Sequence, residues 1–201
     1  MVAGGNKQSN HIDKTEAILP TAALESVLLT ATIDAKEGRD VAIVNILNAF
    51  VTTRIEKKDD IATIRLWGKL AELMVVTAPE IYKKYVTFNS KGELVLYVES
   101  LNALYGIMKA ALLFYIKFVE NLKSIVFQLN TYDPCVANKI VDGAHLTVVW
   151  HVEYLKVSHI YGGVVMRMAA CLKNTYERLL KTDLDQWSST AVWSMSTLEW
   201  H

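Results

Sequence analysis

Two β-branched segments close to each other near the C-terminal end constrain the fold of this chain most strongly. They are Leu146–His151 and Leu155–His159, and only Val152, Glu153 and Tyr154 separate them. Short β-branched and aromatic runs of this kind predict strands, and a gap of three residues is typical of a hairpin connection. The sequence therefore predicts a β-hairpin in this part of the chain.

Hydrophobic periodicity predicts the elements around the hairpin. The predicted helices are one that opens at Pro20-Thr21 and ends at Gly38, two short ones over 69–76 and 79–85, a long one over 100–125 with Gly106 as a weak point, and one over 164–180. The predicted strands are a buried one over Val41–Leu47 and two more over Ile61–Leu66 and Leu94–Val98. This mixture of helices and strands, ending in a hairpin and a helix, indicates an α+β fold.

Two apolar stripes occur at helical spacing, and the one in the long helix is expected to pack into the core. In the first helix the stripe consists of Leu24, Val27, Leu28 and Ala31. In the long helix it consists of Leu101, Leu104, Met108, Leu112 and Tyr115. A surface helix normally turns such a stripe toward the protein interior.

Composition limits the size and class of the protein. The chain has 201 residues, of which 52% are hydrophobic and 21% charged. It can therefore bury a core, which excludes a disordered chain. The 21 basic residues equal the 21 acidic ones in number, so net charge alone does not indicate a nucleic-acid-binding protein.

The chain also lacks the patterns of secreted and membrane proteins. Its two cysteines, Cys135 and Cys171, give no disulfide framework. The N-terminal residues form no signal peptide, and we expect an intracellular location, cytoplasmic or nuclear. The most apolar stretch, Leu101–Val119, is interrupted by Lys109 and Lys117, so no membrane span is expected.

Five local patterns then occur in a fixed order along most of the chain. They are Pro20-Thr21 before the helix Glu25–Ala35, Arg39-Asp-Val-Ala-Ile-Val-Asn45 with Asn48-Ala-Phe50, Ala103-Leu-Tyr-Gly106, Tyr132-Asp-Pro-Cys-Val136, and Trp150-His-Val-Glu-Tyr-Leu-Lys-Val-Ser-His159. Together they resemble the reverse transcriptase of copia-type (Ty/copia) long-terminal-repeat retrotransposons, from about Val2 to Glu177. The resemblance implies a polymerase palm, an antiparallel sheet packed on helices, with part of the fingers.

The resemblance also implies a domain organisation. We expect an irregular lead-in over 1–18, a reverse-transcriptase-like fingers and palm domain over 19–180, and a degenerate tail over 181–201. The thumb is expected to be absent.

The family's metal-binding positions have changed in this chain. The family holds two Mg²⁺ ions with one Asp at the end of the first palm strand and two adjacent Asp residues in the hairpin turn. These positions are Asn45, Glu153 and Tyr154 here. Glu153 keeps a carboxylate as a weak metal ligand, whereas an amide and a phenol carry no negative charge at neutral pH. Asp40 lies roughly 16 Å from Asn45 along an extended strand and cannot replace it. We therefore expect no productive Mg²⁺ binding and no polymerisation.

Other positions carry over as substrate-binding candidates. Phe50 is either the family's aromatic gate against the ribose 2′-hydroxyl or a core aromatic side chain. Tyr105 and Gly106 match the second palm motif, beside the incoming nucleotide and the template. Lys109 stands nearly alone before the apolar run Ala110–Phe114, where the family has a polar and basic run. Binding of primer–template RNA or DNA and of deoxynucleotides is expected to be weak or absent.

A different class of function stays open beside this one. The palm scaffold could serve as a protein-interaction module with no nucleic-acid role, and the sequence leaves the oligomeric state open.

Several other residues allow an ordinary structural interpretation. His145, His151 and His159 surround the hairpin, and local hydrogen bonding is favoured over a zinc site. Cys135 is interpreted as a small buried side chain. Three tryptophans in the tail could stack on bases, although packing is favoured for them: Trp187, Trp193 and Trp200.

Overall fold

The structure is a computed structural model and describes residues 18–57 and 61–176. The predicted lead-in, apart from Ile18, lies outside the described residues, and so do the predicted tail, its three tryptophans and Lys58–Asp60. The chain divides into two compact units. Unit 1 comprises Met1–Leu19 and Phe50–Lys117, and unit 2 comprises Pro20–Ala49 and Phe118–His201.

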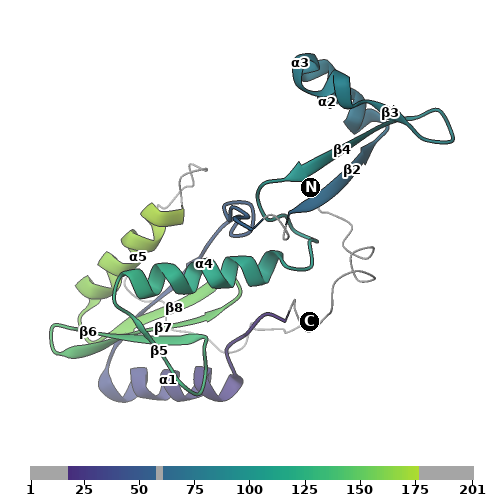
Figure 1. The fold of residues 1–201 in the computed structure, drawn as a ribbon. Coiled ribbons are helices and arrows are strands. Elements are labelled where there is room, and N and C mark those ends of the chain that lie inside the picture. The colour runs from purple at the N-terminus through teal and green to yellow at the C-terminus, as the bar shows by residue number, and fades with distance from the viewer. Residues whose placement is uncertain (1–17, 58–60, 177–201) are drawn as a thin grey trace. The chain divides into compact units, whose positions relative to one another are not determined.

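Unit 2 is built on a five-stranded antiparallel sheet with the strand order β1-β8-β7-β6-β5. The strands are β1 (Asp40–Asn45), β5 (Gln128–Leu129), β6 (Val136–Val141), β7 (Ala144–His151) and β8 (Tyr154–His159). The helices of this unit are α1 (Leu24–Glu37), α5 (Gly162–Tyr176) and the second half of α4 (Ala110–Ser124), as Figure 1 shows. The predicted α+β class is confirmed.

The two faces of this sheet contact different helices, α4 on one face and α1 on the other. On one face Trp150 of β7 meets Phe118 of α4 edge to face, with the ring centroids 5.1 Å apart. Leu155 and Val157 of β8 share that face and are fully buried. Lys156, between them in sequence, points to the opposite face, where it contacts α1.

Helix α1 lies close to its predicted bounds but turns a different side to the sheet. Gly38, with φ 62°, ends the helix in the left-handed conformation that glycine favours. The buried positions of the helix are Thr30 and Asp34, whereas Leu24 and Leu28 are 63% and 46% exposed. The apolar residues at helical spacing, Leu24, Val27 and Leu28, are therefore exposed rather than packed in the core.

Lys156, whose side chain is only 13% exposed, explains this orientation of α1. The Lys156 ammonium donates hydrogen bonds to Asp34 Oδ2 at 2.6 Å and to Thr30 Oγ1 at 2.9 Å. A buried ammonium without such partners would be costly, because it loses its hydration. The polar side of α1 therefore faces the sheet.

Unit 1 contains a three-stranded antiparallel sheet with the order β2-β4-β3. The strands are β2 (Ala62–Trp67), β3 (Thr87–Phe88) and β4 (Leu94–Ser100), and the helical segments are α2 (Lys69–Thr77), α3 (Pro79–Tyr82) and the 3₁₀ turn η4 (Lys83–Tyr85). Leu66, Ala71 and Leu96 form the core between α2 and the sheet. The predicted strands and short helices of this region are confirmed.

The prediction of one long helix over 100–125 is wrong for the residues before Ala110. Helix α4 begins at Ala110, and the segment before it is irregular. Gly106 has φ 92°, outside the helical region, and the side-chain amide of Asn102 donates to the Val51 carbonyl at 2.6 Å. Leu101 is exposed as a result, so it does not belong to a core stripe.

Two strands of unit 2 also differ from the predictions. The predicted buried strand is the edge strand β1, and its Ile43 is exposed. Strand β6 was not predicted at all. It joins β7 through Asp142 and Gly143, which both have positive φ. An Asp-Gly pair between apolar runs is a strong hairpin signal that could have revealed this strand.

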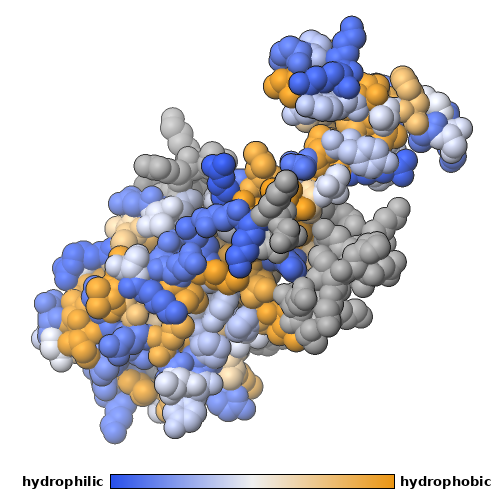
Figure 2. Space-filling model, viewed as in Figure 1, coloured by the Kyte–Doolittle hydropathy of each residue, from blue (hydrophilic) through white to orange (hydrophobic). Residues whose placement is uncertain are grey.

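Apolar side chains occur at the surface of both units. Figure 2 shows hydrophobic residues between hydrophilic ones on the face that it presents. Within the described part of the chain, no helix has the length and apolar character needed to cross a membrane.

Candidate functional site

The three positions to which the resemblance assigns metal ligands meet at one end of the sheet of unit 2. Asn45 is the last residue of β1 and pairs directly with Tyr154, the first residue of β8. Glu153 precedes Tyr154, and its carbonyl oxygen accepts a hydrogen bond from the Ile46 N–H at 2.9 Å. Directly paired residues of antiparallel strands have Cα atoms about 4.5–5.5 Å apart. The fold therefore brings Asn45 beside Glu153 and Tyr154, which follow it by more than 100 residues in the sequence.

The predicted hairpin is confirmed, with a shorter turn than expected. His151 pairs with Tyr154, so the turn contains only Val152 and Glu153. Val152 has φ 54°, a left-handed conformation that is costly for a β-branched side chain. The backbone is therefore strained at the tip of this hairpin.

The side chains at this end of the sheet do not fit a pair of Mg²⁺ ions. Asn45, Glu153 and Tyr154 offer one carboxylate, whereas Mg²⁺ prefers several hard, charged oxygen ligands. Asp40 pairs with His159 at the opposite end of β1, as its place in the sequence predicts. Among residues 18–57 and 61–176, no group of three or more His, Cys, Asp or Glu side chains is arranged to hold a metal ion.

The four predicted substrate-binding residues, by contrast, lie in unit 1. Phe50 is half-buried, with its ring centroid 4.6 Å from that of Tyr105 and 6.2 Å from that of Phe114. It packs against a small core cluster formed by Ala62, Ala103, Ile107 and Ala110. These contacts are those of a core aromatic side chain, and the role of Phe50 as a gate stays a prediction.

Gly106 and Lys109 have local roles in the same region. The positive φ of Gly106 allows the chain to turn before α4. The carbonyl oxygen of Lys109 accepts the Leu113 N–H at 2.9 Å, the first hydrogen bond of that helix. The structure thus groups Tyr105, Gly106 and Lys109 at the start of α4, close to Phe50.

His159 is held by local hydrogen bonds. Its Nδ1 accepts the Tyr161 N–H at 3.0 Å, so Nε2 carries the proton and donates to the Val141 carbonyl, also at 3.0 Å. Both ring nitrogens are therefore occupied, and the interpretation of His159 as a locally bonded histidine is confirmed.

Cys135 is fully buried, as predicted. Burial, together with the neighbouring negative charge of Asp133, raises the pKa of its thiol to about 12. A nucleophilic cysteine requires a thiolate, and this thiol stays protonated at neutral pH.

Asp133 has a structural role that the sequence did not reveal. Its carboxylate accepts the N–H groups of Ala23 at 2.9 Å and of Cys135 at 2.8 Å. Burial alone would raise the pKa of this carboxyl, but hydrogen bonds from Ser26, Cys135 and Ala23 outweigh it and hold the pKa below its usual value. Asp133 therefore caps the first turn of α1 from 110 residues away along the chain.

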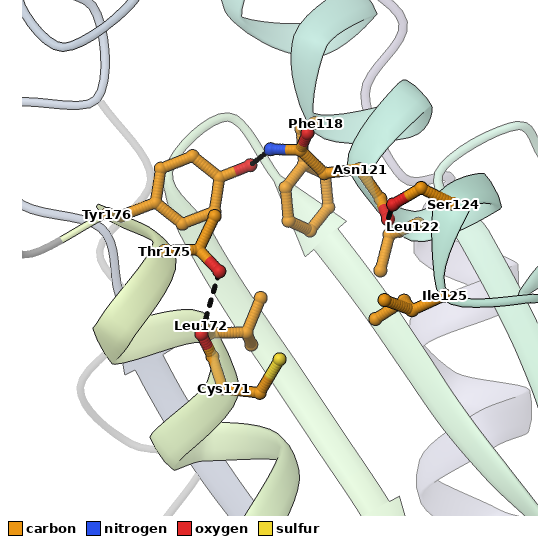
Figure 3. A pocket seen from close by; sticks show the side chains of 9 residues that line it. All are labelled: Phe118, Asn121, Leu122, Ser124, Ile125, Cys171, Leu172, Thr175 and Tyr176. Carbon is orange, nitrogen blue, oxygen red and sulfur yellow. Dashed lines mark hydrogen bonds between the residues drawn. The ribbon is translucent and has the colours of Figure 1, made fainter.

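A small hollow lies between α4 and α5 within unit 2 (Figure 3). Its volume is about 100 Å³, and its lining includes Phe118, Leu122, Leu172 and Tyr176. The Asn121 amide donates to the Tyr176 hydroxyl at 2.7 Å across one end, and burial raises the pKa of that hydroxyl to about 12. The hollow is too small for a nucleotide and contains none of the predicted site residues.

The strongest functional signal in the structure is thus the end of the sheet that carries Asn45, Glu153 and Tyr154. Its backbone arrangement is that of a strand end beside a tight hairpin, and its side chains form a poor metal site. Comparison of the chain with known proteins finds no matching family model, no matching curated protein and no matching solved structure.

Proposed function

We propose that this chain is a reverse-transcriptase-like domain of copia-type retrotransposon origin whose palm no longer catalyses polymerisation. The proposal rests on one observation. Asn45 of β1 pairs directly with Tyr154 of β8, and Glu153 lies beside them in the hairpin turn. The resemblance assigns the family's metal carboxylates to these same three positions.

The chemistry of nucleotidyl transfer explains the loss of activity. Two divalent cations about 3.5–4 Å apart stabilise the attacking and leaving oxygens, and carboxylates must balance their charge. Asn45 and Tyr154 contribute no negative charge at neutral pH, so Glu153 alone would face both ions. The residues present do not fit the metal pair, and the chain is expected to be inactive.

Restoring the carboxylates tests the proposal. The unmodified chain and the variant Asn45→Asp/Glu153→Asp/Tyr154→Asp are compared in Mn²⁺ titrations and in primer extension with Mg²⁺ or Mn²⁺. The triple variant is expected to gain Mn²⁺ affinity, while the unmodified chain extends no primer. A matched control carries Val41→Asp and Ile43→Asp, which add charges to the same strand away from the hairpin turn.

Each outcome of these measurements bears on a separate claim. Extension by the unmodified chain contradicts its inactivity. A triple variant that binds Mn²⁺ no better than the control contradicts the assignment of the three positions. A triple variant that binds Mn²⁺ without extending a primer supports the palm assignment and points to a second defect, in nucleotide or primer binding.

We expect unit 1 to have some affinity for nucleic acid. Although the whole chain has no net charge, this unit contains more basic than acidic residues. Lys and Arg outnumber Asp and Glu by twelve to nine over the residues of unit 1. Trp67 and Tyr97 are 60% and 58% exposed on one face of the β2-β4-β3 sheet. The guanidinium of Arg65, which pairs with Tyr97, lies 5.9 Å from the Trp67 ring centre. Exposed aromatic rings with basic neighbours are typical of surfaces that stack on single-stranded bases.

A fluorescence titration with single-stranded RNA at two salt concentrations measures this affinity. Binding is expected to be weak, to fall with added salt, and to fall about tenfold in Trp67→Ala. Phe88→Ala is the matched control, because Phe88 is a similarly exposed aromatic residue of the same sheet on its other face.

The protein-interaction module remains the second candidate function. The specific observation in its favour is the exposed leucine side of α1 in unit 2. Undetectable or salt-insensitive RNA binding would favour this candidate over a nucleic-acid role.

A further inference from the structure

Helix α1 presents to solvent the side that an ordinary surface helix buries. Thr30 and Asp34 face the sheet of unit 2, whereas Leu24 and Leu28 are largely exposed. The first turn is held by the Asp133 carboxylate, again a polar contact. Polar contacts therefore attach the helix to its own unit and leave an apolar side uncovered, and such a side is typical of an interaction surface.

The uncovered side has a regular pattern. Leu24, Leu28, Ala31 and Ala35 are separated by four, three and four residues, the spacing at which one helix packs along another. We call these four residues the α1 stripe. The two large side chains lie at the N-terminal end of the stripe and the two small ones at its C-terminal end.

This pattern is complementary to itself in the antiparallel direction. When two copies of α1 pack antiparallel about a two-fold axis, Leu24 of each copy meets Ala35 of the other, and Leu28 meets Ala31. Large side chains then pack against small ones at every level, whereas a parallel pair would place leucine on leucine and alanine on alanine. Closed two-fold dimers use one self-complementary patch in this way.

The charged residues beside the stripe also favour antiparallel packing. Glu25 lies in the first turn of α1 and Lys36 in the last turn, and both flank the stripe on the same side of the helix. Antiparallel packing brings Glu25 of one copy beside the last turn of the other, which carries Lys36. It also places the positive end of each helix dipole beside the negative end of the other.

We propose that the α1 stripe is a homodimer interface, and that two copies of this chain associate through antiparallel packing of their α1 helices. The proposal does not depend on the proposed function, since it uses no residue of the hairpin end. A helix of 14 residues offers less area than the standard protein–protein interface of about 1,200–2,000 Å². The dimer is therefore expected to be weak and to form over a micromolar range of concentration.

Sedimentation equilibrium of the full chain over a wide range of concentration tests the proposal. Leu28→Lys is expected to raise the dimer dissociation constant at least about a hundredfold, because each dimer loses two buried leucines. Met166→Lys is the matched control, since Met166 is 51% exposed in α5 and belongs neither to the stripe nor to its charged flank. This control is expected to leave the dissociation constant within about twofold of the unmodified value. Leu28→Ala, expected to weaken the dimer about tenfold, serves as a second variant if the lysine disturbs folding.

A charge exchange tests the antiparallel arrangement. Glu25→Lys and Lys36→Glu are each expected to weaken the dimer about two- to tenfold, and the double variant is expected to restore it, because the exchanged charges meet again. A chain that stays monomeric at the highest concentration overturns the proposal and leaves the stripe to another partner. Equal effects of Leu28→Lys and Met166→Lys also overturn it, and a double variant that dimerises no more strongly than the single ones overturns the antiparallel arrangement.

Discussion

Replacement of Asp133 tests how the chain holds α1 on unit 2. The carboxylate accepts hydrogen bonds from the N–H groups of Ala23 and Cys135, at 2.9 and 2.8 Å, and the Ser26 hydroxyl is a third donor. Asp133→Ala removes all three bonds and leaves the buried N–H of Cys135 without an acceptor. Asp133→Asn keeps one acceptor oxygen and nearly the same shape, but its NH₂ group cannot accept, so it removes the charge and one of the two backbone hydrogen bonds.

The magnitude follows from the kinds of bond that are lost. Hydrogen bonds to a charged group contribute about 1.5–3 kcal/mol each, and such terms do not add fully. Loss of a helix N-cap costs about 1 kcal/mol, and the charge near the helix N-terminus contributes about 0.3–1 kcal/mol. We therefore expect Asp133→Ala to lower the free energy of unfolding by about 3 kcal/mol, and Asp133→Asn to lower it by about half as much.

The pH dependence separates the charge from the shape of the side chain. Hydrogen bonds hold the pKa of Asp133 below its unfolded value of 3.8. A carboxyl with a lowered pKa contributes stability that is complete above the unfolded pKa and is lost as the pH falls through the folded pKa. The stability difference between the unmodified chain and Asp133→Asn should thus be constant near neutral pH and shrink in the acid range, below about pH 4.

Urea denaturation followed by circular dichroism, repeated from neutral to acid pH, measures these differences. Asp142→Asn is the matched control, because Asp142 is an exposed turn residue whose left-handed conformation asparagine tolerates. The control is expected to change stability by less than about 0.5 kcal/mol. An Asp133→Ala effect as small as the control, or an Asp133→Asn difference that persists unchanged in acid, would refute the capping role.

Three further predictions concern the interior of unit 2. Asp34→Ala should lower the free energy of unfolding by about 3 kcal/mol, because it leaves the largely buried Lys156 ammonium without its carboxylate and with only the Thr30 hydroxyl as a partner. Asp34→Leu combined with Lys156→Met should restore most of that loss in urea titrations. Val152→Gly should raise stability by about 1 kcal/mol in the same assay, because it removes the strain of a β-branched residue at φ 54°; a loss of stability would contradict that strain. In the native chain a thiol reagent should modify exposed Cys171 quickly and Cys135 only on unfolding; equal rates would contradict the burial of Cys135.

Sequence patterns predicted most elements of this fold because local periodicity reflects local structure. The hairpin, the strands of unit 1 and the helix that follows His159 appear near their expected positions. The start of α4 could not be placed by periodicity, because the apolar spacing continues through a segment that Gly106 and Asn102 hold in another conformation. The positive φ of Gly106 interrupts the helix here, although the apolar residues on both sides of it keep helical spacing.

The side of α1 that packs on the sheet could not be predicted from the helix alone. Its apolar spacing indicates the leucine side, but the choice depends on Lys156, which lies 122 residues after its partner Asp34. Desolvating an ammonium without an acceptor costs several kcal/mol. This cost is larger than that of leaving one or two leucine side chains exposed. Long-range polar pairs of this kind leave no local signal in the sequence.

If the chain has the reverse-transcriptase-like origin proposed above, the candidate site explains how the fold could be kept after the metal carboxylates were lost. The strand pairing that joins Asn45 to Tyr154 uses backbone groups, and the contacts that hold α1 use Asp133, Asp34 and Lys156, none of which is a metal position. Three carboxylates in this small space would repel one another when no cation is bound. Their replacement by an amide, one carboxylate and a phenol removes that repulsion without removing a backbone hydrogen bond. Selection for stability alone would therefore not preserve the metal ligands, and a chain released from catalysis would be free to lose them while it kept the fold.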